Sequence, residues 1–337
     1  MQVGIVSIAY HLPDEVLDNE SLAAANPRFR AEKVKAKTGI DRRHVAADDE
    51  TAADLAVKAA ERLFAERGIA RDTIDLVIFC TQAPDYFLPT TACIIHARLG
   101  LSTTAGAFDI NLGCSGFVYG LGVAGAMIET GQANRVLLLT ADTYSKFIDI
   151  GDLSVRSIFG DAGAATLIEG GRGALGPFVY GTDGTGAGHL IVPTGGLRSP
   201  SDGVETGGGY TVHGGRHRPG KPLHMNGPEV FNFSISAVPK AVEALLEKAA
   251  VPIDAVDLFV FHQANTTMLE ALRRKLDIPP ERFFVDLSDA GNTVSSTIPI
   301  ALRRALEQGR LQPGYRVMLV GFGVGYSWAA TLLTWGV

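Results

Sequence analysis

The sequence contains two copies of one pattern, and this internal repeat constrains the fold more than any other feature. Each copy has a helical pattern, a short loop and an Asp-Leu pair that leads into an apolar strand. The corresponding segments keep the same order: 56–82 with 241–263, 134–142 with 315–323, and 163–170 with 329–336. Three pairs of positions, 75 with 257, 135 with 316 and 117 with 298, lie 181 or 182 residues apart. Chance similarity does not preserve order and spacing together, so the repeat predicts two α/β halves around a pseudo-two-fold axis.

Strands alternate with helices within each copy, which indicates βαβ units and a mostly parallel sheet. The predicted strands are 3–8, 75–80, 134–140, 163–168, 257–261, 283–286 and 316–321. The predicted helices are 52–67, 89–99, 115–131, 228–249, 264–275 and 293–308. We expect an N-terminal half over 1–170 and a C-terminal half over 171–337, the latter interrupted by a long loop at 192–224.

Composition excludes several functional classes. The chain has 337 residues and a net charge of −6 with scattered basic residues, which argues against nucleic acid as the main partner. No apolar stretch is long enough for a membrane span. The cysteines Cys80, Cys93 and Cys114 are an odd count within 35 residues, so they do not form a disulfide framework. We therefore expect a cytoplasmic protein.

Cys114 is the candidate nucleophile. It follows a predicted strand, and a helix of small and apolar residues begins at or just after it. The positive end of a helix dipole and unpaired N–H groups would lower the pKa of the thiol and raise its thiolate fraction. Burial as a small apolar residue is the competing interpretation, which we favour for Cys80 and Cys93.

His262 and Asn292 lie at two further strand–helix junctions, both in the second copy. Taken alone, His262 can be interpreted as a histidine in a surface loop and Asn292 as a helix N-cap, neither with a catalytic role. The repeat, however, places all three junctions at one edge, where ligands gather in α/β sheets. Cys, His and Asn together are the components of a thiolate acyl-transfer site. The glycine-rich segment 321–328 also follows a strand, and its N–H groups are suited to an oxyanion.

These motifs resemble those of the β-ketoacyl-acyl carrier protein synthase III family, within the thiolase superfamily. The resemblance runs almost end to end and includes TGIDRRHV (38–45), FGDAGAA (159–165), MNGPEVF (225–231), HQAN (262–265), GNTVSS (291–296) and GFGVGYSW (321–328). It implies a thiolase-like, five-layered αβαβα fold and a homodimer. It also implies an acyltransferase with a triad of Cys114, His262 and Asn292.

The family mechanism implies a decarboxylative Claisen condensation. Cys114 takes an acyl group from an acyl thioester, with an oxyanion hole formed by the N–H groups of Cys114 and Val324. His262 and Asn292 then hydrogen-bond the carbonyl of a malonyl thioester. Loss of CO₂ leaves an enolate that attacks the acyl group and releases a 3-ketoacyl thioester. No metal or redox cofactor is expected, because the substrates carry phosphopantetheine as coenzyme A (CoA) or acyl carrier protein.

The carrier-binding surface departs from the family pattern. Thr267 and Lys37 stand where the family usually has Arg, and Lys33 and Lys35 lie near the usual place of a Trp. The candidate carrier-binding residues are Lys33, Lys37, Arg42, Asn265 and Arg273, with Phe87 and Leu88 expected at the acyl pocket of a dimer. The long loop adds His213, Arg216, His217 and Arg218 as candidates at the entrance, and no metal site is expected there. These departures suggest a specialised paralogue.

Three alternatives remain open. A related acyltransferase would pass the Cys114-bound acyl group to an alcohol or amine, with His262 as general base and no decarboxylation. A papain-like protease shares the order Cys, His, Asn, but the repeat argues against it. A non-catalytic partner subunit is disfavoured by the intact triad. A thiolase would need a second reactive cysteine in the C-terminal half, and there is none.

Overall fold

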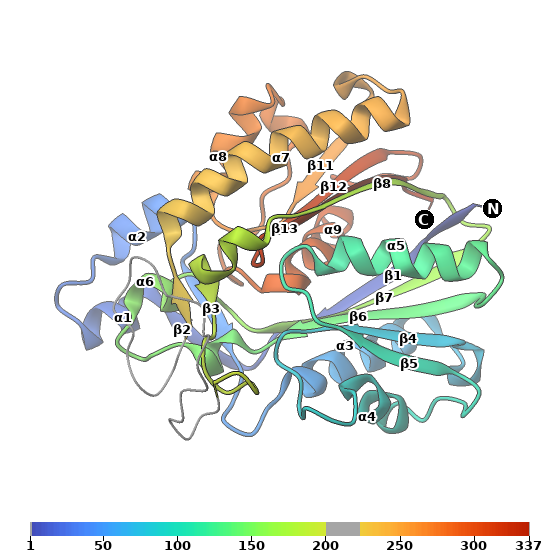
Figure 1. Cartoon of the computed structure of the whole chain (residues 1–337), viewed down its shortest axis with the longest axis horizontal. Helices are drawn as coiled ribbons and strands as arrows, with labels where there is room; N and C mark the ends of the chain where they lie inside the picture. Colours follow the sequence, from blue (N-terminus) through green and yellow to red (C-terminus); the bar gives the residue numbers. More distant parts are fainter. Residues whose placement is uncertain (1, 200–222, 337) are drawn as a thin grey trace.

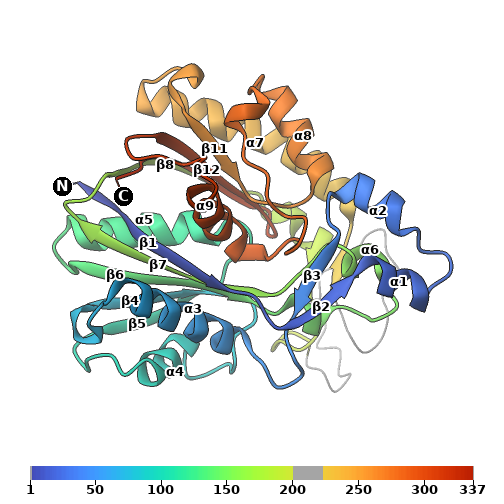
Figure 2. The same cartoon turned by 180° about the vertical axis from the view of Figure 1, so that it is seen from behind.

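Two β-sheets with the same strand order form the framework of the fold. The computed structural model describes residues 2–199 and 223–336 (Figures 1 and 2). The first sheet has the order β1-β7-β6-β4-β5 and the second β8-β13-β12-β11. The first comprises β1 (Val3–His11), β4 (Leu76–Cys80), β5 (Gly106–Ile110), β6 (Arg135–Asp142) and β7 (Ala162–Gly170). The second comprises β8 (Ala174–Thr182), β11 (Leu258–Phe261), β12 (Arg316–Gly323) and β13 (Ser327–Thr334).

The pairing confirms the internal repeat but not a mostly parallel sheet. In each sheet the first two neighbouring pairs are antiparallel and the next pair is parallel. In the second half, for example, β12 and β13 are joined by a turn of only three residues, and so short a connection requires antiparallel neighbours. The predicted strand over 283–286 is wrong, because that segment makes a single bridge, Phe283 with Phe259, beside β11.

Helices fill the space between the sheets and cover both outer faces, which confirms the five-layered αβαβα arrangement (Figure 1). α5 and α9 lie between the sheets, α3 and α4 cover the first sheet, and α7 and α8 cover the second. The bounds are α3 (Ala52–Arg67), α4 (Thr91–Arg98), α5 (Gly116–Glu129), α7 (Gly227–Ala249), α8 (Thr266–Lys275) and α9 (Thr297–Glu307). The division of the chain at residue 170 stays a prediction.

Local sequence explains why these helices form where they do. Thr51 caps α3 in a capping box with Asp54, and Gly68 ends the helix in a left-handed conformation with a φ of 62°. α5 is apolar around most of its circumference, as a helix enclosed by two sheets must be. Gly120 lets it approach the first sheet closely, since a Cβ there would lie 2.7 Å from Leu138.

Shorter elements surround the loops at one end of the two sheets. β2 (Glu15–Asp18) pairs with β3 (Arg42–Val45), and β9 (Leu190–Ile191) pairs with β10 (His224–Met225). The short helices here are α1 (Asn19–Ala25), α2 (Ala31–Thr38) and α6 (Leu153–Arg156). Figures 1 and 2 show these helices at the same end of the molecule as β2 and β3. Residues of α2 and α6 line a cavity at this end of the molecule.

Candidate active site

One cavity of about 970 Å³ brings together the three residues singled out from the sequence. Cys114, His262 and Asn292 all line it, with Phe322 and Gly323 from the end of β12. Cys114 lies between β5 and α5, His262 directly follows β11, and Asn292 precedes the 3₁₀ helix η6 (Val294–Ser296). The predicted convergence of these junctions on a common site is therefore what the structure shows.

The Cys114 thiol is enclosed, and its acidity differs from the expectation. Burial and the nearby carboxyl group of Asp142 raise the pKa of the thiol to about 12, although hydrogen bonds from the N–H groups of Val324 and Cys114 lower it. The prediction of a lowered pKa is wrong, because desolvation outweighs the start of α5. The thiol is protonated at neutral pH and needs a base before it can act as a nucleophile.

The glycine-rich turn packs directly on Cys114. A Cβ atom at Gly323 would lie 2.8 Å from Sγ of Cys114, and one at Gly321 would lie 2.8 Å from the Cys114 carbonyl oxygen. Only glycine leaves room for the thiol at this distance. The backbone N–H groups of Val324 and Cys114 both face the sulfur of Cys114.

His262 is held by two hydrogen bonds. Its backbone N–H donates to the carbonyl oxygen of Val320 at 2.8 Å, and Nδ1 of its ring lies 2.7 Å from Oγ1 of Thr297. The side chain is only 2% exposed, and burial lowers its pKa to about 3, so the ring is neutral. Nε2 makes no hydrogen bond within the described residues and remains available to a ligand in the cavity.

Asn292 presents its amide group in a defined orientation. Its Oδ1 accepts a hydrogen bond from the backbone N–H of Val294 at 2.9 Å. The backbone N–H of Asn292 donates to the carbonyl oxygen of Ile158 at 2.9 Å. With Oδ1 occupied, Nδ2 is the free end of the amide, and it can only donate. Val294 has a φ of 54°, unusual for a β-branched residue, and such local strain is common at functional sites.

The mouth of the cavity is cationic. Three of the candidate carrier-binding residues, Lys33 and Lys37 on α2 and Asn265, line it, and Thr267 on α8 joins them. Arg28 and Arg30, which the sequence analysis did not select, line the same cavity. Their signal was present in the sequence, because five basic residues lie within the ten positions 28–37.

Other candidates lie away from this cavity. Arg273 is held by Glu270 and by the carbonyl oxygen of Ile278, and Arg42 does not line the cavity. Phe87 and Leu88 are 79% and 82% exposed at the surface. The four entrance candidates of the long loop, His213, Arg216, His217 and Arg218, lie outside the described residues.

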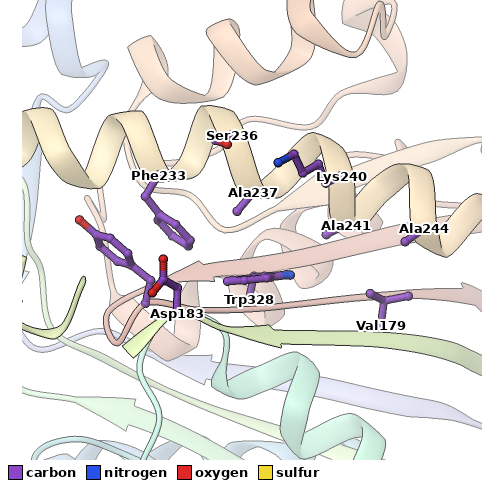
Figure 3. A pocket seen from close by; sticks show the side chains of 10 residues that line it. Val179, Asp183, Phe233, Ser236, Ala237, Lys240, Ala241, Ala244 and Trp328 are labelled. Carbon is purple, nitrogen blue, oxygen red and sulfur yellow. The ribbon is translucent and has the colours of Figure 1, made fainter. Parts of the chain in front are cut away.

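A second, smaller cavity lies behind the glycine-rich turn (Figure 3). It measures about 400 Å³, and Phe233 and Lys240 of α7 face Trp328 of β13 across it. Tyr326 also lines it, stacks on Phe233 at 4.0 Å and hydrogen-bonds Nδ1 of His189 through its hydroxyl at 2.7 Å. The turn that carries the Val324 N–H is therefore supported from outside the main cavity.

Two classes of feature are missing from the described part of the chain. In residues 2–199 and 223–336, no three His, Cys, Asp or Glu side chains are grouped so that they could hold a metal ion. None of the helices in the same ranges is long and apolar enough to cross a membrane.

Comparison with known proteins identifies the family. Residues 108–184 match the family described as 3-oxoacyl-[acyl-carrier-protein (ACP)] synthase III, and residues 246–335 match its C-terminal region. A β-ketoacyl-[acyl-carrier-protein] synthase III of Symbiobacterium thermophilum is 37% identical over 99% of this chain and 98% of its own length.

Solved structures give the same result. A crystal structure of a 3-oxoacyl-(acyl-carrier-protein) synthase III is 50% identical, with a TM-score of 0.94 over 99% of this chain and 100% of its own. A 3-oxoacyl-(acyl-carrier protein) synthase of Burkholderia xenovorans is 38% identical, with a TM-score of 0.89 over 100% of this chain and 95% of its own. The thiolase-like fold and the acyltransferase class expected from the sequence are thereby confirmed. The chain belongs to the 3-oxoacyl-[acyl-carrier-protein] synthase III family.

Proposed function

We propose that the protein joins an acyl group to a malonyl unit in two steps, with Cys114 as the nucleophile. The observation that supports this most is the convergence of Cys114, His262 and Asn292 on one cavity, each with a polar atom available to a substrate. The product is a 3-ketoacyl thioester.

In the first step, the Cys114 sulfur attacks the carbonyl carbon of an acyl thioester. The thiol proton must leave, because burial keeps the pKa of this thiol at about 12. The carbonyl oxygen gains negative charge, which the N–H groups of Val324 and Cys114 are placed to stabilise. The carrier departs as a free thiol, and Cys114 keeps the acyl group as a new thioester.

In the second step, a malonyl thioester loses CO₂ and becomes an enolate. The Nδ2 group of Asn292 is free to donate to its carbonyl oxygen, where the charge develops. The enolate carbon attacks the acyl group, a carbon–carbon bond forms, and the bond from Cys114 to the acyl group breaks. The thiolate of Cys114 then takes up a proton, so this chemistry requires no metal or redox cofactor.

The cationic mouth suits a phosphopantetheine carrier. Lys33 and Lys37, joined there by Arg28 and Arg30, offer positive charge to phosphate groups outside the apolar interior. CoA and acyl carrier protein both bring such phosphates, and we place this arm along α2 and α8. The three free cysteines fit a reducing compartment, and we place the reaction in the cytoplasm.

We also propose a homodimer that covers Phe87 and Leu88. Two adjacent large apolar side chains exposed to this degree are uncommon on a monomer. Sedimentation velocity should show a dimer for the unaltered chain and a monomer for a Phe87→Asp, Leu88→Asp double variant. Val285→Asp, at an exposed apolar residue elsewhere, should leave the dimer intact. A monomeric unaltered chain would refute the dimer.

Intact-protein mass spectrometry tests the reaction directly. We expect one acyl mass to appear after brief incubation with a panel of acyl-CoA thioesters, and to be absent in Cys114→Ala. Addition of a malonyl thioester should discharge the acyl-enzyme with release of CO₂ and a 3-ketoacyl product. Failure of both acyl-CoA and acyl-carrier-protein donors to load Cys114 would overturn the proposed function.

A further inference from the structure

The second cavity, behind the glycine-rich turn, has aromatic rings on its floor and at one end. The indole ring of Trp328 lies flat against its neighbour on β8, because a Cβ atom at Gly181 would lie within 2.4 Å of three of the ring atoms. Phe233 reaches from α7 towards the sheet, tilted by 49° to the indole with ring centres 5.8 Å apart (Figure 3). Tyr326 stacks on Phe233. Trp328 is only half-buried, so part of its ring surface stays open to the cavity.

Helix α7 forms the opposite wall and leaves space over the indole. Beside Phe233 it presents small residues to the cavity, Ala237, Ala241 and Ala244, which lie on one face of the helix. The volume of about 400 Å³ lies within the range usual for small-molecule sites, about 300–1,000 Å³. A planar ring suits a space between a helix and an indole ring, because it can stack on the indole face.

The charged groups on the two walls favour an acid. Lys240 lines the cavity from α7, is exposed, and makes no hydrogen bond or ion pair with any residue in 2–199 or 223–336. Nε1 of Trp328 also has no hydrogen-bond partner in these ranges, so two donors are available to a ligand. Asp183 follows β8 on the opposite wall, and its Oδ1 accepts hydrogen bonds from the N–H and the hydroxyl of Thr185. A carboxylate group is therefore favoured on the Lys240 side of the cavity.

We propose that the second cavity is a binding site for a planar aromatic acid, with the ring on the indole of Trp328 and the carboxylate group at Lys240. Stacking on the floor selects a flat molecule, and the cation on α7 selects a negative charge. The site is separate from the main cavity that Cys114 lines, because the two share no lining residue. The proposal therefore goes beyond the proposed function and does not depend on it.

A ligand in this cavity contacts the turn that faces Cys114 from the other side. The N–H of Tyr326 donates to the carbonyl oxygen of Asp183 at 2.8 Å, and the N–H of Asp183 donates to the carbonyl oxygen of Tyr326 at 2.9 Å. Two residues before Tyr326, the N–H of Val324 faces the Cys114 sulfur. A ligand that binds the folded arrangement stabilises it against local opening, so the Tyr326 amide hydrogen should exchange more slowly when the cavity is occupied.

NMR of ¹⁵N-labelled protein gives a direct readout, because Trp328 and Trp335 are the only tryptophans of the chain. Trp335 is buried and does not line the cavity, and Trp335→Phe assigns the two indole signals. We expect 2-naphthoate to shift the Trp328 signal until it saturates and to leave the Trp335 signal in place. Decahydro-2-naphthoate keeps the charge but is not planar, and 2-naphthalenemethanol is planar but neutral, so both should bind more weakly.

Variants locate the carboxylate group. Lys240→Ala should weaken the binding of 2-naphthoate by about two- to five-fold, the effect of one exposed charge, and leave the binding of 2-naphthalenemethanol unchanged. Lys248→Ala is the matched control on the same helix and should alter neither, because this amine already donates to the carbonyl oxygen of Phe178. Asp183→Asn removes a negative charge and should not weaken the binding of the acid.

A filled cavity should no longer bind the probe. Ala237→Leu places a larger side chain over the indole and should abolish the Trp328 shift, while an unchanged Trp335 signal reports that the chain is folded. If Ala237→Leu does not fold, the three probes and the lysine variants still decide the matter. Hydrogen exchange at Tyr326, with and without saturating 2-naphthoate, tests the contact with the turn.

Three results would overturn the inference. They are the absence of a saturable Trp328 shift with 2-naphthoate, equal binding of the acid and its neutral analogue, and loss of the shift in Lys37→Ala, which would place the probe in the main cavity. Unchanged exchange at Tyr326 in the saturated protein would refute the link to the turn. None of these measurements uses the loading of Cys114, so the proposed function can fail while this site stands, and the reverse also holds.

Discussion

Asp142 and Ser295 are joined by two hydrogen bonds in the buried interior of the site. The Ser295 hydroxyl donates to Oδ2 of Asp142 at 2.5 Å, and the Ser295 N–H donates to the same oxygen at 3.3 Å. The other oxygen, Oδ1, accepts from the N–H of Gln82 at 2.8 Å. Asp142 ends β6 and Ser295 follows Asn292 by three residues, so this carboxyl group ties the two halves of the site together.

The first prediction concerns stability against pH. Burial raises the pKa of Asp142 to about 7, from a usual value of 3.8 in the unfolded chain. The folded chain therefore binds the proton of Asp142 more tightly than the unfolded chain does. The stability that this protonation contributes is present below about pH 4 and is lost as the pH rises to about 7. Relative to Asp142→Asn, the free energy of unfolding should fall through this window by at most about 1.4 kcal/mol per pH unit.

Urea unfolding at pH 5, 6, 7 and 8 checks this difference. Above pH 7 the two free energies should run parallel, because the carboxyl group is then ionised in both states of the unaltered chain. Asp72→Asn, at an exposed position, should follow the unaltered chain throughout. Parallel curves for Asp142→Asn from pH 5 to 8 would show that Asp142 does not titrate in this range.

The second prediction concerns the reactivity of Cys114 in the free enzyme. Because its pKa is about 12, alkylation by iodoacetamide should be slow at pH 7 and should still be increasing above pH 9. The charge of Asp142 contributes to that high value, so Asp142→Asn should be alkylated faster at pH 8. Peptide mapping separates Cys114 from the exposed Cys93, and a plateau in the Cys114 rate below pH 9 would contradict the prediction.

Much of the fold follows from local sequence because the decisive signals are short in range. Thr51 and Asp54 mark the start of α3 and Gly68 its end, and the structure has the helix over the predicted 52–67. The matching segments of the repeat correspond to strands in equivalent places in the two sheets, such as β6 and β12. The strand predicted over 283–286 does not form. Whether this segment pairs along the edge of β11 depends on contacts between residues that are distant in the sequence.

The sequence predicts the location of the site better than its chemistry. A strand–helix junction predicts where Cys114 lies, but the pKa of its thiol depends on burial and on Asp142, 28 positions away in the sequence. The contact from Thr297 to His262 likewise spans 35 residues. Thr297 follows directly on the segment GNTVSS, but no spacing rule connects it to a histidine ring. Such pairs become visible only when the loops are placed in three dimensions.

The third prediction tests the glycine that faces the thiol. In Gly323→Ala, the added methyl group would lie 2.8 Å from Sγ of Cys114, closer than real Cβ contacts. The thiol or the turn must shift, and misplacement by about 1 Å commonly costs about 10²-fold in rate. We expect loading of Cys114 to fall by that factor. Gly184→Ala is the matched control, because a Cβ there meets nothing within 4 Å. Equal loading rates in the two variants would contradict the close contact.

The last prediction concerns the cationic mouth of the main cavity. Lys33 and Lys37 line it, whereas Arg273 is occupied by its ion pair with Glu270. Each exposed charge contributes up to about 1 kcal/mol, so Lys33→Ala and Lys37→Ala should each raise KM for a CoA thioester by about two- to five-fold, with kcat little changed.

The two effects should shrink at high ionic strength, because salt screens exposed charges. Arg273→Ala is the matched control and should leave KM unchanged, since its guanidinium group is already paired. Steady-state kinetics at 0.05 M and 0.5 M NaCl separate these cases. A rise in KM for Arg273→Ala equal to that for Lys37→Ala would show that general surface charge, and not the mouth at α2, attracts the carrier.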